Sequence, residues 1–165
     1  MVYQFMNFAV RDNIAWITFN RPEAFNAINS QATSEFYDIV NRCSVDTSLR
    51  AVVLKGMGER AFCAGGDVAE IVQKGDEVEL MLREMTTLLH TGISRLARLR
   101  APVIAAVNGV AAGAGLSFVA CCDLAIAADT AKFTSAYTQI GLTPDGSSTY
   151  FLTRLVGERR VKELY

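Results

Sequence analysis

The sequence predicts an α/β fold with a mainly parallel sheet, built as one domain over residues 1–165. Short apolar runs of the kind that form buried strands alternate with segments whose apolar residues recur at helical spacing. Two of these runs end in glycine-rich turns. The chain has 165 residues, 51% hydrophobic and 20% charged, which is enough to bury a core, and no interior linker divides it.

The predicted elements alternate in order along the chain. Residues 2–10 and 14–20 are expected strands, because a polar, turn-prone tripeptide separates two mostly apolar runs. Asn29 or Ser30 caps a first helix, in which apolar residues recur at helical spacing up to Cys43. The remaining expected elements are a strand at 51–55, a short helix near 68–73, a long helix at 77–99, a strand at 102–107, a helix at 114–121, a strand at 124–128 and a helix from Ser148.

Two glycine-rich turns carry the main functional signal. The first covers residues 62–67 and follows the strand at 51–55; the second covers 108–115 and follows the strand at 102–107. Small residues let the backbone approach a ligand closely, and a helix that starts there directs unpaired N–H groups at the ligand. Two such turns that meet in space would bind developing negative charge, as an oxyanion hole does.

Composition argues against several classes of partner. The net charge of −1 gives no electrostatic basis for binding nucleic acid or an anionic membrane. Residues 101–122 carry no charge and are long enough to cross a bilayer, but Pro102, Asn108 and three glycines interrupt them. We therefore expect a buried strand, turn and helix there and no membrane span.

The cysteine and glycine spacings exclude other familiar sites. The four cysteines fit no zinc pattern, so no metal site is expected, and polar residues interrupt the opening run where a signal segment would lie. These two observations predict a reduced, cytoplasmic protein. The turn at 109–115 lacks the G-x-G-x-x-G spacing of dinucleotide-binding domains, and no Gly-Lys-Ser/Thr step suggests a P-loop.

Six ordered segments resemble the crotonase superfamily, the enoyl-CoA hydratase/isomerase family. They span nearly the whole chain and are NRPEAFNA (20–27), AFCAGGD (61–67), PVIAAVNG (102–109), CDLAIA (122–127), GLTPDG (141–146) and LTRLVG (152–157). The resemblance implies a spiral of ββα repeats and acyl-CoA substrates, with no cofactor beyond the coenzyme A of the substrate. It also implies a homotrimer or dimer of trimers for the full-length protein.

The end of the chain suggests that part of this fold is missing. Gly157 interrupts the last helical segment, the residues after it favour a new helix, and no helix-stop signal follows. Family members continue into further helices that cover the site and build the trimer. We therefore expect the chain to lack the C-terminal helical part.

The resemblance assigns roles to the two turns. It implies that the backbone N–H groups of Gly66 and Ala114 bind the oxygen of a thioester enolate. Family members often have glycine at the second position, and alanine keeps the N–H group. The implied substrate contacts include the loop that lines the coenzyme A channel, a carbonyl that faces adenine and an aromatic wall of the acyl pocket: Ala24, Phe25, Ala64, Gly65, Asp67 and Tyr137.

The catalytic carboxylates of hydratases are absent from their matching positions. Ser117 and Tyr137 stand where the resemblance places two glutamates, which leaves Asp145 as the carboxylate. A similar aspartate is the base in phenylacetate-pathway-type isomerases and the nucleophile in 4-chlorobenzoyl-CoA dehalogenase. The local pattern alone favours Asp145 as the N-cap of the helix from Ser148. The missing glutamates and the family match together favour catalysis.

His90 is the one histidine, and its role is open. Its place on a long helix favours a structural or surface role, whereas the dehalogenase has a water-activating histidine at the corresponding place. The sequence thus predicts an enoyl-CoA isomerase with Asp145 as base. Enoyl-CoA hydration and dehalogenase-like hydrolysis stay as alternatives, and so does a non-catalytic member that binds RNA or acts in an assembly.

Overall fold

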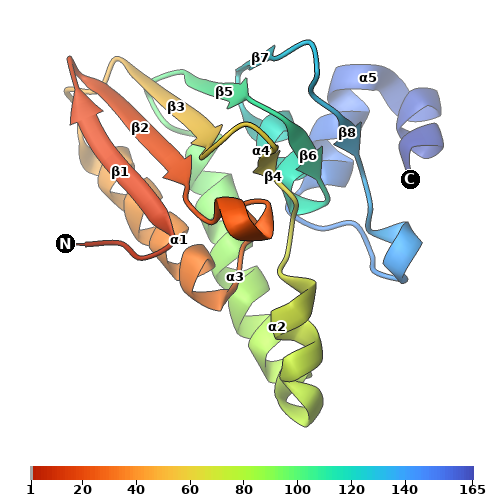
Figure 1. The fold of residues 1–165 in the computed structure, drawn as a ribbon. Helices are drawn as coiled ribbons and strands as arrows, with labels where there is room; N and C mark the ends of the chain where they lie inside the picture. Colours follow the sequence, from red (N-terminus) through yellow and green to blue (C-terminus); the bar gives the residue numbers. More distant parts are fainter. Residues whose placement is uncertain (1) are drawn as a thin grey trace.

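The computed structural model describes residues 2–165 and has two sheets covered by helices (Figure 1). The larger sheet has the order β1-β2-β3-β5-β7, and the smaller has the order β4-β6-β8. The strands β1 and β2 are antiparallel, and every other pairing between described strands is parallel, which confirms the α/β class. The strands are β1 Met6–Arg11, β2 Ile14–Phe19, β3 Ala51–Gly56, β4 Ala61–Cys63, β5 Val103–Val107, β6 Val110–Ala112, β7 Leu124–Ala127 and β8 Phe133–Thr134.

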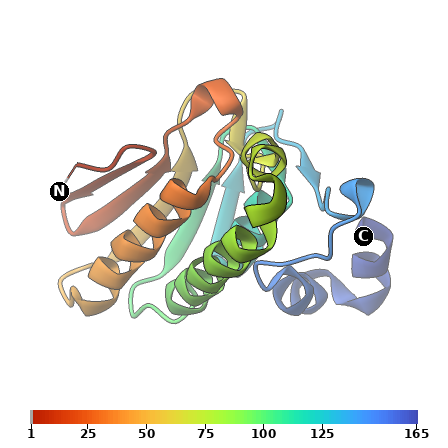
Figure 2. The same ribbon diagram turned by 90° about the horizontal axis from the view of Figure 1, so that it is seen from below.

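Two long helices, α1 (Ser30–Val45) and α3 (Val78–Leu96), lie side by side on one face of the larger sheet (Figure 2). Their apolar faces and the inward residues of the strands form the main core, with Phe36 and Ile93 fully buried. Gly92 lets the helices approach, because a Cβ there would lie 2.7 Å from the Phe36 ring. The other helices are α2 Val68–Gln73, α4 Ala114–Cys121 and α5 Ser148–Leu164, with 3₁₀ turns η1 Pro22–Ala24, η2 Gly75–Glu77 and η3 Thr138–Ile140.

The chain repeats a ββα unit, as the family resemblance implies. In the first repeat both strands, β1 and β2, belong to the larger sheet. In the later repeats the first strand joins the larger sheet and the second joins the smaller one: β3 then β4, β5 then β6, and β7 then β8. The sequence indicated turns where β4 and β6 lie, and β8 was not expected. These strands have two or three residues each, too few for an alternating pattern to show, and partners distant in sequence hold them.

Element ends depart from the prediction where side chains replace strand pairing. The first strand begins at Met6 rather than at residue 2, because the N–H groups of Gln4, Phe5 and Met6 each donate to the Glu35 carboxylate on α1 at 2.9 Å. The long helix is shorter at both ends than the expected 77–99. Gly157 breaks α5 (φ 81°, ψ 159°), which confirms the predicted interruption.

The uncharged stretch at 101–122 folds as expected. It contains β5, β6 and α4, joined by the second glycine turn. None of the helices in residues 2–165 is long and apolar enough to cross a membrane.

Candidate active site

The two glycine-rich turns meet in space, as the sequence predicts. Gly65 has φ +95°, and a Cβ on it would lie 2.9 Å from the Ala112 carbonyl oxygen and 3.3 Å from the Ala114 nitrogen. A Cβ on Gly115 would lie 2.0 Å from the carbonyl oxygen of Cys63. Only glycine allows backbone to approach backbone so closely at these two positions.

Each turn presents one unpaired N–H group. The residues on either side of Gly66 are hydrogen-bonded to Ile28: the Gly65 carbonyl accepts the Ile28 N–H, and the Asp67 N–H donates to the Ile28 carbonyl. The N–H of Gly66 itself makes no such bond. Ala114 is the first residue of α4, so its N–H has no partner within the helix. Neither N–H group donates a hydrogen bond within the described residues. Ala114 does not need a positive φ, so alanine is unstrained there.

Gly66 and Ala114 line one cavity of about 70 Å³ together with Tyr137 and Asp145. Helices α2 and α3 and two loops supply a mostly apolar wall: Ile28, Ile71, Leu82, Met85, Thr86, Leu89 and Leu142. Asp145 is the one carboxylate among the described residues of this lining. The cavity therefore combines two anion-binding N–H groups, one carboxylate and walls that strengthen electrostatic contacts by excluding water.

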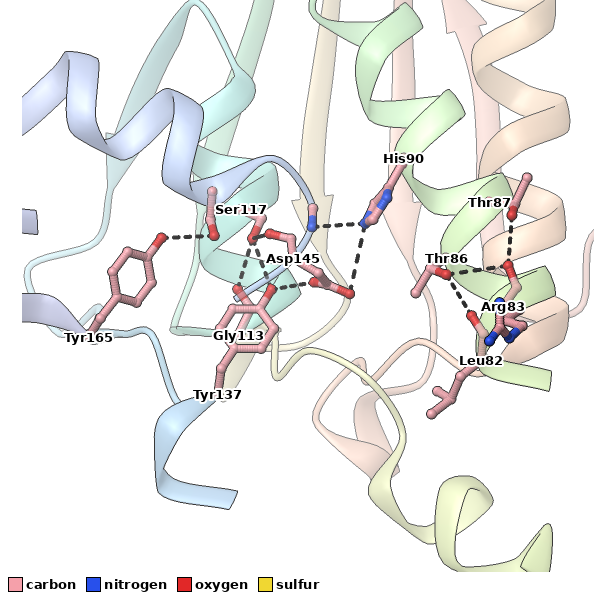
Figure 3. A network of polar contacts seen from close by, with 12 residues as sticks. Leu82, Arg83, Thr86, Thr87, His90, Gly113, Ser117, Tyr137, Asp145 and Tyr165 are labelled. Atoms are coloured by element: carbon pink, nitrogen blue, oxygen red, sulfur yellow. Dashed lines mark hydrogen bonds and ion pairs between the residues drawn. The ribbon is translucent and has the colours of Figure 1, made fainter. Parts of the chain in front are cut away.

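The carboxylate of Asp145 is held by a neighbour and does not cap a helix (Figure 3). Its Oδ1 accepts a hydrogen bond from the Tyr137 hydroxyl at 2.7 Å, and its Oδ2 lies 4.0 Å from Nε2 of His90. The residue at the cap position of α5 is Ser147, with no side-chain cap, and Asp145 contributes only its backbone carbonyl to Ser148 N–H. The capping alternative is therefore wrong.

Tyr137 is suited to donate this hydrogen bond. Burial of the ring, followed by the charge of Asp145, raises the pKa of Tyr137 well above its ordinary value, so the hydroxyl stays protonated. The Tyr137 hydroxyl also lies 3.0 Å from the Ser117 hydroxyl. The two positions where the family resemblance implies glutamates in hydratases thus hold a hydrogen-bonded serine–tyrosine pair in this chain.

His90 lies beside Asp145, which its local pattern did not indicate. Its Nε2 accepts a hydrogen bond from the backbone N–H of Gly146 at 3.2 Å, and its side chain is half-exposed. His90 follows Leu82 and Thr86 of the cavity wall at intervals of four residues, which places the three on one face of α3. That spacing is the sequence signal that would have linked His90 to the pocket.

The sequence model of the family described as Enoyl-CoA hydratase/isomerase matches residues 9–165. The chain belongs to this family. It is 39% identical over 153 residues to 4-chlorobenzoyl coenzyme A dehalogenase-2 of Arthrobacter sp, covering 92% of this chain and 55% of the relative. It is 36% identical over 157 residues to 1,2-epoxyphenylacetyl-CoA isomerase of Escherichia coli, covering 94% and 59%.

Hydratases are similar to this family member to the same degree. Short-chain-enoyl-CoA hydratase of Clostridium acetobutylicum is 37% identical over 151 residues, covering 92% of this chain and 57% of the relative. The crystal structure of an enoyl-CoA hydratase from Bacillus anthracis matches with a TM-score of 0.90 at 31% identity, covering 98% of this chain and 62% of that one. This family member spans a little over half the length of the curated relatives it matches, and identity does not choose between their reactions.

The loop of Ala24 and Phe25 is held against the first turn by local contacts. Phe25 follows η1 with φ 53°, and the guanidinium of Arg60 lies 3.9 Å from the centre of its ring. Its carbonyl accepts the N–H of Ala64 at 3.1 Å. Within residues 2–165 the carbonyl of Ala64 itself accepts no hydrogen bond, so it remains available. Ala24 is the last residue of η1 and lies half-buried beside them.

Asp67 shapes the first turn from its far end. Its Oδ1 accepts the N–H groups of Ala69 and Glu70, so it caps α2, and its Oδ2 pairs with Arg21 at 2.8 Å. Burial raises the pKa of Asp67, but the hydrogen bonds from Arg21 and the backbone outweigh this effect and leave the pKa lowered. Asp67 does not line the cavity, so a contact between it and substrate stays a prediction.

Proposed function

We propose that this family member moves the double bond of an enoyl-CoA thioester, with Asp145 as the base. The observation that carries the proposal is a single carboxylate, Asp145, on a cavity that also presents the unpaired N–H groups of Gly66 and Ala114. Hydration uses one group to activate water and another to handle the α-proton, and the second carboxylate is absent from this lining. Isomerisation needs only one base, which removes a proton and returns it.

The chemistry follows from the acidity of the substrate. In a 3-enoyl thioester the protons on C2 are both α to the carbonyl and allylic. Asp145 takes one of them, and the electron pair of the broken C–H bond spreads into a dienolate whose oxygen accepts hydrogen bonds from Gly66 and Ala114. Asp145 then delivers the proton to C4, which leaves the double bond between C2 and C3. Each N–H donor contributes about 3–4 kcal/mol of barrier lowering.

The remaining substrate contacts follow from the turn geometry. We expect the unpaired carbonyl of Ala64 to accept a hydrogen bond from adenine. The Phe25 carbonyl, which accepts the Ala64 N–H at 3.1 Å, holds the loop of Ala24 and Phe25 next to it. The Tyr137 ring and the apolar wall face the acyl group from the cavity lining. A homotrimer or a dimer of trimers is the assembly that we propose for the full-length protein.

The test is to incubate the chain with a 3-enoyl-CoA and to follow the conjugated 2-enoyl product by absorbance and mass. We expect Asp145→Asn to lower kcat by about 10²–10⁴-fold. Asp129→Asn, which changes an exposed carboxylate outside the cavity, should leave kcat unchanged. An Asp145→Asn protein that isomerises at the wild-type rate would refute the proposal, and rapid addition of water to a 2-enoyl-CoA would favour hydration.

One observation favours a second candidate, the hydrolytic removal of chloride from the ring of 4-chlorobenzoyl-CoA. His90 Nε2 lies 4.0 Å from Asp145 Oδ2, close enough for His90 to activate a water that attacks an ester formed on that carboxylate. In that reaction Asp145 attacks the ring carbon that bears chlorine, and chloride leaves. His90 then takes a proton from the water that cleaves the resulting aryl ester. Chloride release from 4-chlorobenzoyl-CoA, without isomerisation of any 3-enoyl-CoA, would select this candidate.

A further inference from the structure

The Ser117 hydroxyl is buried between the two halves of the candidate site (Figure 3). Ser117 lies one helical turn after Ala114 on α4 and is fully buried. Its Oγ lies 3.0 Å from the Tyr137 hydroxyl, 3.1 Å from the Asp145 carbonyl oxygen and 3.3 Å from the Gly113 carbonyl oxygen. One hydroxyl thus touches both the turn that carries an oxyanion donor and the loop that carries the base.

The direction of the hydrogen bonds follows from the acceptors. A carboxylate is the strongest acceptor present, so the Tyr137 hydrogen goes to Asp145 Oδ1, in agreement with the 2.7 Å distance. The Tyr137 oxygen is then left to accept. Ser117 has one hydrogen, and three oxygens lie within reach of it: the Tyr137 hydroxyl oxygen at 3.0 Å, the Asp145 carbonyl at 3.1 Å and the Gly113 carbonyl at 3.3 Å. The Tyr137 oxygen is the nearest of the three. The result is a chain from Ser117 through Tyr137 to Oδ1.

We propose that Ser117 is a positioning residue for Asp145: acting through Tyr137 and the Asp145 backbone, it fixes carboxylate oxygen Oδ1 and leaves Oδ2 to carry the proton. The inference rests on the proposed function of Asp145 as a base. Oδ2 accepts no hydrogen bond within the described residues, and His90 Nε2, at 4.0 Å, already accepts the Gly146 N–H. Oδ2 therefore takes the proton from C2 and delivers it to C4, while the Tyr137 hydrogen stays on Tyr137.

The size of Ser117 is matched to this arrangement. A Cβ on Gly146 would lie 2.8 Å from Ser117 Cβ, so the loop of Asp145 packs directly on the serine. A glutamate at 117 would occupy the space that this loop fills. A small hydroxyl residue at this position is therefore what brings Asp145 onto the cavity.

The experiment is a double-mutant cycle measured on 3-enoyl-CoA isomerisation. We expect kcat to fall about 10–100-fold in Tyr137→Phe and about 10-fold in Ser117→Ala, with KM within about twofold of wild type. The Ser117→Ala/Tyr137→Phe double variant should fall by less than the product of the two single losses, because the two hydroxyls act in series. Tyr150→Phe and Ser44→Ala, which alter exposed residues, are the matched controls.

A second measurement separates this inference from the proposed function. Exchange of the α-protons of butyryl-CoA in D₂O, followed by NMR, needs only the base and the oxyanion donors. Thermal unfolding midpoints check that each variant is folded.

Each outcome decides the inference. Coupled losses in isomerisation support it, and coupled losses in exchange support it even if wild type isomerises nothing. If Asp145→Asn is inactive while both hydroxyl variants keep the wild-type rate, or their losses simply multiply, the positioning role is wrong and the proposed function stands. If the wild-type chain neither isomerises a 3-enoyl-CoA nor exchanges the α-protons of butyryl-CoA, both the positioning role of Ser117 and the proposed function are wrong.

Discussion

The backbone N–H of Gly146 donates a hydrogen bond to Nε2 of His90 at 3.2 Å, which joins the loop of Asp145 to helix α3. Nε2 accepts this hydrogen bond with its lone pair, which leaves Nδ1 as the ring nitrogen that carries hydrogen. The 4.0 Å distance from Nε2 to Asp145 Oδ2 is too long for a hydrogen bond and becomes an ion pair only when His90 is protonated. With Nε2 accepting the Gly146 N–H, His90 anchors the loop that carries Asp145.

This relationship predicts different effects of His90→Ala on the two candidate reactions. Isomerisation should fall by no more than about 10-fold, because the loop loses one hydrogen bond to a neutral acceptor. Hydrolytic dechlorination of 4-chlorobenzoyl-CoA should fall by about 10²–10⁴-fold, because the general base is lost. Parallel assays of both thioesters check this. His90→Gln, which keeps an acceptor oxygen, is the control, and a loss of isomerisation as large as that in Asp145→Asn would contradict the anchoring role.

The adjacent glycines of the first turn should respond differently to alanine. Gly65→Ala should lower the free energy of unfolding by about 1–3 kcal/mol, because φ is +95° and the added Cβ would lie 2.9 Å from the Ala112 oxygen. Gly66 has no heavy atom within 4 Å of an added Cβ, so Gly66→Ala should change stability by less than about 1 kcal/mol. Urea unfolding of both variants measures the difference, and equal losses would mean that the turns do not require glycine at 65.

The segment before β1 should depend on one buried carboxylate. Glu35 is 5% exposed and accepts the N–H groups of Gln4, Phe5 and Met6. Glu35→Ala should lower the free energy of unfolding by about 1–3 kcal/mol, because these donors lose their acceptor. Glu84→Ala, at an exposed position of α3, is the control. Early hydrogen exchange at Met6 in Glu35→Ala would locate the loss, and unchanged stability would show that the segment is held by other contacts.

Acid stability should depend on Asp67. Its pKa is lowered in the folded chain because Arg21 and backbone N–H groups outweigh the opposite effect of burial. A carboxyl group of this kind stabilises the fold above its unfolded pKa of about 3.9, and the stabilisation is lost as pH falls through the folded value.

The Asp67→Asn variant isolates this charge effect. Asparagine keeps a capping oxygen for α2 but cannot pair with Arg21, so its unfolding free energy should fall less steeply than that of wild type below about pH 4. Denaturation with urea at several pH values measures the slopes, with Asp129→Asn as the control. Equal slopes for wild type and Asp67→Asn would contradict the assignment.

Strong local patterns made most of the fold predictable. The helices α1 and α3 and the strands β3 and β5 are long enough for the spacing of their apolar residues to show, and the structure has them near the expected bounds. The strands β4, β6 and β8 have no such pattern, since each is defined by a parallel partner from a distant repeat. The first strand was predicted too long because a carboxylate on α1, rather than a neighbouring strand, binds residues 4 and 5.

By itself, the sequence determined the family, the two glycine turns and the candidate carboxylate. Each of these is a motif of consecutive residues, so it can be recognised without knowing which distant segments it contacts. Only the tertiary structure decided what surrounds Asp145. Ser117, Tyr137 and His90 lie 28, 8 and 55 residues from it in the chain: Ser117 on α4, Tyr137 just before η3 and His90 on α3. The spacing of apolar residues in the sequence indicates which residues are buried. Which buried side chains hydrogen-bond to one another depends on how elements distant in the sequence pack together. That packing made Asp145 a held carboxylate on a cavity instead of a helix cap.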